Sequence, residues 1–138
     1  METCHTKSVD ETMLLAAELA KQARGGGVYA FFGGMGMGKT AFIKGFVKGM
    51  GNSSDVSSPT FALVNDYGGD PHIYHFDMYR VESWDDLCST GFFDYMDGDS
   101  ILLIEWSENI EAALPDDAVR ITISMGESEN ERVISIDN

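Results

Sequence analysis

Basic side chains are scarce in this sequence, which has nine lysines and arginines against 23 aspartates and glutamates and a net charge of −14 at pH 7. A surface of that charge repels nucleic-acid phosphates, so we do not expect the protein to bind RNA or DNA by itself. Cysteine is also rare. Cys4 and Cys88 form no C-x-x-C pair, so they give no support to a disulfide framework or a cysteine metal site.

Long hydrophobic runs are absent as well. No apolar stretch approaches the roughly 18 residues of a membrane span, and residues 1–12 lack the apolar segment of a secretory signal. We therefore expect a cytoplasmic protein with no membrane contact. The length of 138 residues suits one domain, residues 1–138, with a substantial core. Within it we expect residues 1–7 to be flexible.

A glycine-rich turn follows the first strongly apolar segment. Residues 33–40 match G-x-x-x-x-G-K-[ST], the phosphate-binding loop. Such a loop turns successive N–H groups toward a polyphosphate, and the helix that follows adds its positive dipole end. Lys39 would reach the β- and γ-phosphates, and the Thr40 hydroxyl would bind Mg²⁺. The alternative, a glycine-rich hairpin between two strands, fits poorly because a helical pattern follows the Lys-Thr pair.

Helical spacing and strand alternation outline an α/β fold. Ser8 and Glu11 have the spacing of a capping box, and apolar residues then recur at helical spacing as far as the glycines at 25–27. Further helices are predicted after the phosphate-binding loop, at 83–90 and at 107–113, with strands at 28–33, 61–67, 73–77, 101–106, 118–125 and 132–137. We predict a P-loop NTPase-like mixed sheet flanked by helices, with antiparallel hairpins at 61–77 and 118–137. Gly45 and Gly49, inside the second helix, suggest a close contact of that helix with the sheet.

A phosphate-binding loop needs a carboxylate at the end of a neighbouring strand to hold Mg²⁺. Asp77 and Glu105 both follow apolar strands. The strand before Glu105 is the more completely apolar, which favours it as the central neighbour of the strand at 28–33 and favours Glu105 as the metal ligand. Asp77 then becomes the candidate for positioning water or for an outer contact to the metal.

Other residues carry weaker signals. His72 and His75 are three apart on a strand and face opposite sides, so we expect surface or packing roles for them. Trp106 could stack on a base or a partner, or could simply pack. Thr60 resembles a switch threonine that senses the γ-phosphate.

The residues beyond the phosphate-binding loop bear on the choice of nucleotide and of reaction. No N-K-x-D element for guanine is present, which favours ATP over GTP. A stand-alone small-molecule kinase is disfavoured, because only three arginines lie beyond the loop and no lid insertion is evident. A nucleotide-gated binding module with little hydrolysis is the other alternative.

Several motifs occur together in a characteristic order: GGMGMGKT, VSSPTF, LVNDY, HFDMYR, DDLCSTGFFDYM and ILLIEWSE. With them the chain resembles the TsaE (YjeE) family of bacterial P-loop ATPases over residues 8–137. The resemblance implies a cytoplasmic, Mg²⁺-dependent ATPase that is needed for threonylcarbamoyladenosine in tRNA. It implies TsaD and TsaB proteins as partners, which stimulate a weak ATPase and through which alone tRNA is reached. By itself we expect the chain to be a monomer.

The resemblance also assigns roles to individual residues. Thr40 and Glu105 would bind Mg²⁺, with Lys39, Asp77 and Glu105 as the catalytic group. Thr60 would sense the nucleotide, Trp106 would be a functional neighbour, and Thr12 matches a threonine near the nucleotide. The remaining nucleotide contacts would be Gly33, Gly34, Met35, Gly36, Met37, Gly38 and Ala41. Gly34 stands where the family usually has an acid, which removes a negative charge beside the phosphates.

Overall fold

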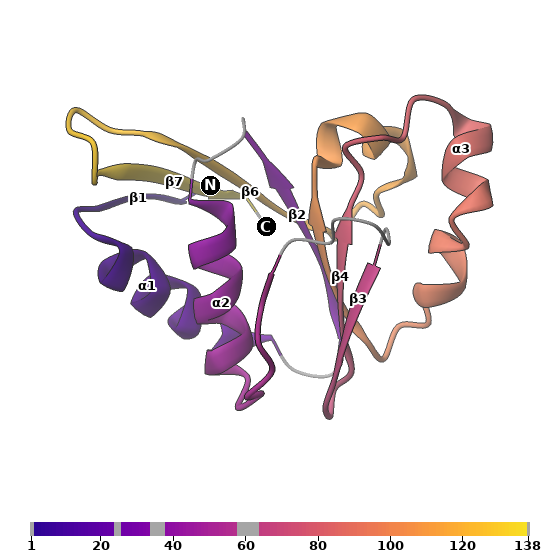
Figure 1. Ribbon diagram of the computed structural model, residues 1–138, viewed down its shortest axis with the longest axis horizontal. Helices are drawn as coiled ribbons and strands as arrows, with labels where there is room; N and C mark the ends of the chain where they lie inside the picture. Colours follow the sequence, from indigo (N-terminus) through magenta and orange to yellow (C-terminus); the bar gives the residue numbers. More distant parts are fainter. Residues whose placement is uncertain (1, 24–25, 34–37, 58–63, 138) are drawn as a thin grey trace.

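A seven-stranded mixed sheet forms the centre of the computed structural model, which describes residues 2–23, 26–33, 38–57 and 64–137 (Figure 1). The strand order is β1-β7-β6-β2-β5-β4-β3. Along the chain the elements are β1 (Glu2–Thr6), α1 (Val9–Gln22), β2 (Gly27–Phe32), α2 (Lys39–Gly49), β3 (Val64–Gly68), β4 (Ile73–Asp77), α3 (Trp84–Ser89), η1 (Phe92–Tyr95), β5 (Ile101–Glu105), η2 (Ser107–Ala113), β6 (Val119–Met125) and β7 (Arg132–Asp137). In this part of the chain, no helix is both long and apolar enough to cross a membrane.

The middle of the sheet is parallel and its outer parts are antiparallel. Strand β2 pairs in parallel with both β5 and β6, and β5 pairs in parallel with β4. The β3–β4 and β6–β7 pairs are antiparallel. The predicted mixed α/β fold and both hairpins are therefore confirmed, except that residues 61–63 of the first hairpin lie outside the described residues.

The expectation for the N-terminus is wrong. We expected residues 1–7 to be flexible, yet Glu2–Thr6 forms strand β1, which pairs in antiparallel register with β7 at the edge of the sheet. The sequence signal is weak because β1 buries little: of its five residues only Thr6 is buried. Its order comes from main-chain pairing with a strand more than 120 residues away in sequence.

The helices cover both faces of the sheet, as Figure 1 shows. Helices α1 and α2 pack on the face to which β2 contributes Tyr29 and Phe31, whereas α3, η1 and η2 pack on the face that carries Ala30. Strand β5 is buried along its whole length, with alternate residues in each layer. This two-sided burial explains why the central strands read as continuous apolar runs.

The close contact of α2 is with a helix. A Cβ added at Gly45 would lie 2.3 Å from the backbone oxygen of Met13, and one added at Gly49 would lie 2.6 Å from the Cα of Ala17. The expected contact with the sheet is therefore wrong, because these glycines let α1 and α2 approach backbone to backbone. The register of the two contacts, four residues apart on each helix, shows that the helices run in the same direction. Their N-terminal turns consequently lie side by side.

Candidate nucleotide-binding site

The two ends of the predicted phosphate-binding loop have conformations that require glycine. Gly33, directly after β2, has φ 122°, and a Cβ there would lie 2.6 Å from the carbonyl oxygen of Ile123. Gly38 has φ 90° in the left-handed region and immediately precedes α2. The predicted strand before the loop and helix after it are therefore confirmed. Residues 34–37 (Gly34, Met35, Gly36 and Met37), which we predict to surround the phosphates, lie outside the described residues.

Lys39 is a buried cation in the first turn of α2. Its side chain is 4% exposed, and its Nζ donates a hydrogen bond of 3.0 Å to the carbonyl oxygen of Gly33. The same Nζ lies 4.8 Å from the ring centroid of Trp106. Lys39 thereby connects the two ends of the loop, from the residue after β2 to the residue that begins α2. A lysine is rarely buried to this extent unless it has a partner for its charge.

The two candidate acids are adjacent at the carboxyl ends of parallel strands. Asp77 of β4 is the register partner of Glu105 of β5. The prediction that the Glu105 strand is the parallel neighbour of the strand leading into the loop is confirmed, since β5 pairs with β2. Asp77 is one strand further away. Glu105 is buried, at 5% exposed, and Asp77 is half-buried.

Asp77 is also held by the turn that follows it. Its Oδ1 accepts a hydrogen bond of 2.9 Å from the backbone N–H of Tyr79. Burial raises the pKa of the Asp77 carboxyl and the negative charge of Glu105 raises it further, whereas the Tyr79 N–H, His75 and Lys39 lower it. A carboxyl in such an environment has more affinity for a proton than an exposed aspartate, which suits a group that orients water or accepts a proton from it.

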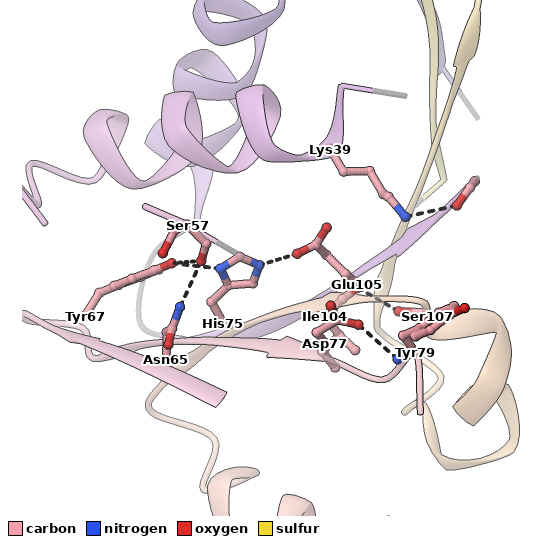
Figure 2. A network of polar contacts seen from close by, with 11 residues as sticks. Lys39, Ser57, Asn65, Tyr67, His75, Asp77, Tyr79, Ile104, Glu105 and Ser107 are labelled. Carbon is pink, nitrogen blue, oxygen red and sulfur yellow. Dashed lines mark hydrogen bonds and ion pairs between the residues drawn. The ribbon is translucent and has the colours of Figure 1, made fainter. Parts of the chain in front are cut away.

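His75 is a site residue that sequence reasoning missed. It is fully buried, with Nε2 2.7 Å from Glu105 Oε2 and Nδ1 2.8 Å from the hydroxyl of Tyr67 (Figure 2). Of the expected surface or packing role, the surface role is wrong for this residue, whereas its full burial agrees with packing. One signal was available: His75 is two residues before Asp77 on the same strand, so their side chains share a face. His72, in contrast, is partly exposed, pairs with Asp66 and stacks on Tyr74.

Trp106 lies in a strained backbone position directly after β5. Its φ of 59° and ψ of 41° are left-handed, which costs about 1 kcal/mol for a residue with a Cβ. Its ring lies 4.9 Å from that of Tyr79 and faces the Lys39 ammonium. Among the described residues, therefore, Trp106 packs within its own chain, beside the residues predicted to hold phosphate.

The remaining predicted contacts lie around the start of α2. Thr40 and Ala41 are in its first turn and are partly buried. Thr12, on the neighbouring α1, is 2% exposed, and its Oγ1 lies 2.6 Å from the Oγ1 of Thr6. Its hydroxyl is thus part of the packing between β1 and α1. Thr60 and the adjoining Ser58 and Pro59 lie outside the described residues. The nucleotide roles of these residues stay predictions.

The comparisons with known proteins agree with one another. Residues 6–134 match the family model described as "Threonylcarbamoyl adenosine biosynthesis protein TsaE". The tRNA threonylcarbamoyladenosine biosynthesis protein TsaE of Bacillus subtilis (strain 168) is 38% identical over 128 residues, spanning 91% of this chain and 80% of that protein. The protein of the same name from Treponema pallidum (strain Nichols) is 32% identical over 120 residues, 87% of this chain and 89% of its own. The crystal structure of Bacillus subtilis YdiB matches with a TM-score of 0.76 and 31% identity, covering 98% of this chain and 83% of that chain.

Proposed function

The chain belongs to the TsaE family of threonylcarbamoyl adenosine biosynthesis proteins, and from this premise we propose that it binds and hydrolyses ATP to support threonylcarbamoyladenosine modification of tRNA. The observation that carries the nucleotide part of the proposal is the buried Lys39 ammonium, which lies between the two glycine-bounded ends of the loop. Backbone N–H groups at the start of α2 and the helix dipole add to the attraction for phosphate. The net charge of −14 makes this local cation stand out from the rest of the chain.

Mg²⁺ suits the oxygen ligands near the loop. The ion commonly uses one or two carboxylates together with phosphate oxygens and water. The Thr40 hydroxyl and the buried Glu105 carboxylate are ligands of that kind, and Asp77 is adjacent to Glu105 in the sheet register. When bound, the ion would neutralise phosphate charge during hydrolysis. In the proposal Lys39 holds the β- and γ-phosphates, and Asp77 orients the attacking water from the rim of the site.

The acidic surface supports an indirect relation to tRNA. Because a net charge of −14 repels phosphate backbones, tRNA would be held by partners with basic surfaces. We propose TsaD and TsaB as those partners, with a weak ATPase in the isolated monomer and a faster one in the complex. We propose a cytoplasmic location, as the family resemblance implies. ATP hydrolysis would then drive a conformational change in the partner complex.

A reconstitution tests this function. The purified chain is mixed with TsaD, TsaB, tRNA, a threonylcarbamoyl donor and labelled ATP–Mg²⁺, and both free phosphate and modified tRNA are measured. We expect slow release of phosphate by the chain alone, faster release with the partners, and continued tRNA modification only when the chain is present. In a parallel reaction of the chain with labelled ATP and a set of metabolites, labelled phosphate transferred to a metabolite would instead indicate a kinase. Full tRNA modification without the chain would contradict the proposal.

A further inference from the structure

We propose that His75 is a positioning residue, which holds the Glu105 carboxylate in place for Mg²⁺ while Tyr67 holds the imidazole from its other side. The metal role of Glu105 rests on the proposed function. The hydrogen bonds of His75 do not depend on the proposed function, because they are observed between residues that the structure describes. His75 lies between Glu105 and Tyr67 in the network drawn in Figure 2.

The network assigns a direction to the hydrogen bond between the imidazole and Glu105. As a Mg²⁺ ligand Glu105 would be ionised and could only accept hydrogen bonds, so His75 Nε2 would carry the proton and donate it to Glu105 Oε2 over 2.7 Å. The other ring nitrogen, Nδ1, forms a hydrogen bond of 2.8 Å with the Tyr67 hydroxyl. With a partner at each ring nitrogen and no exposed surface, the imidazole has one orientation available. Such a ring restrains the carboxylate from the side of Oε2.

Tyr67 connects this arrangement to the backbone of Ser57. The Tyr67 hydroxyl lies 3.2 Å from the Ser57 carbonyl oxygen, which also accepts a hydrogen bond of 2.8 Å from Asn65 Nδ2. Ser57 directly precedes the predicted nucleotide-sensing residues Ser58, Pro59 and Thr60 in sequence. The contacts therefore extend from the predicted metal ligand on β5, through β4 and β3, to the residue before that segment.

A purely structural role does not account for this choice of residue. His75 shares the face of the sheet that α1 and α2 cover, where the neighbouring side chains of β4 and β5 include Ile73 and Leu103. An aliphatic side chain could fill such a position without burying a polar ring. Burial of an imidazole is compensated here only because both of its nitrogens have partners. One of those partners is an acid at the end of a central parallel strand.

Two substitutions separate the two sides of the imidazole. A glutamine at this position can place its amide N–H where Nε2 was and keep the contact with Glu105. An asparagine is shorter and can reproduce only the Nδ1 side, toward Tyr67. The matched pair is therefore His75→Gln and His75→Asn, with Tyr67→Phe to remove the hydroxyl alone. Each variant is made in the full chain, and its thermal unfolding is recorded.

The decisive measurement is the affinity of Mn²⁺, used as a spectroscopic substitute for Mg²⁺, for the protein–ADP complex. Affinity for ADP in the presence of a chelator is measured alongside it by calorimetry. We expect His75→Asn to weaken Mn²⁺ binding about 10- to 100-fold, as loss of an outer partner of a metal ligand does. His75→Gln should remain within about threefold of wild type, Tyr67→Phe should lie between the two, and metal-free ADP affinity should change less than about twofold.

Equal Mn²⁺ affinities in the asparagine and glutamine variants would overturn the inference. So would a parallel loss of metal-free ADP affinity, which would mark His75 as a structural residue only. Nitrogen-15 NMR of the wild-type imidazole provides a test that needs neither nucleotide nor variant. A proton on Nε2 is expected, and an Nε2 without a proton contradicts the network. If the wild-type chain binds no ADP at all, the proposed function fails, and the NMR result alone decides whether His75 is oriented as proposed.

Discussion

Replacing Lys39 by methionine should abolish tight nucleotide binding while leaving the fold nearly as stable as before. Methionine keeps most of the length and the apolar stem of lysine but removes the charge. Loss of one partner of a buried, charge-assisted contact weakens binding by about 2–5 kcal/mol. At about 1.4 kcal/mol for each factor of ten, that corresponds to an increase of about 30- to 4,000-fold in the Kd for ADP. We expect about 100-fold or more.

The effect on folding is small because the costs and gains of burying this ammonium nearly cancel. Taking the charge out of water costs several kcal/mol. Against this stand one charge-assisted hydrogen bond to the Gly33 carbonyl, worth about 1.5–3 kcal/mol, and the contact with the Trp106 ring, worth about 0.5–2 kcal/mol. The free energy of unfolding of the Lys39→Met protein should therefore stay within about 1 kcal/mol of wild type.

Calorimetric titration with ADP measures the first quantity, and chemical denaturation measures the second. Lys44→Met and Lys48→Met provide matched controls, because both lysines are exposed on the same helix and carry the same charge. Their Kd values should stay within about twofold of wild type. A Kd for the Lys39→Met protein within threefold of wild type would refute the assignment of Lys39 to phosphate. Equal weakening in all three variants would show that only the overall charge matters.

Three further predictions concern the metal ligand, the helix contact and the helix start. Glu105→Gln should lower the rate of ATP hydrolysis at least about 100-fold, because an amide is a poor Mg²⁺ ligand. Its metal-free affinity for ADP, measured by calorimetry, should stay within about threefold of wild type. An unchanged rate of hydrolysis would contradict the metal role. Gly45→Ala should lower the melting temperature by about 8 °C, which corresponds to about 2 kcal/mol in the free energy of unfolding, because the new methyl group meets the Met13 backbone. Lys44→Ala, at an exposed position on the same helix, is the control. An equal shift in both variants would argue against the close contact. Ser8→Ala should cost about 1 kcal/mol in chemical denaturation, since the Ser8 Oγ accepts the Glu11 N–H at 3.1 Å, and no loss would mean that the cap contributes nothing.

The features that sequence predicted well are local ones. The capping box places Ser8 and Glu11 within one helical turn, and Ser8 caps α1 as expected. The glycines at 33 and 38 occupy positive-φ positions that the loop motif requires. The apolar run before Glu105 indicated a strand covered on both sides, and that strand is the parallel neighbour of β2. In each case the residues that determine the structure are close together in sequence.

Tertiary structure decided whatever depends on a distant partner. Residues 2–6 become a strand only through pairing with β7, and Gly45 is required only because α1 packs backbone to backbone against α2. His75 acquires its partner Glu105 from a strand 30 residues later. The sequence alone determined which residues are candidates for binding phosphate and metal, since motif spacing encodes backbone conformation. Burial and strand register determined which of them meet, because both are properties of the folded chain as a whole.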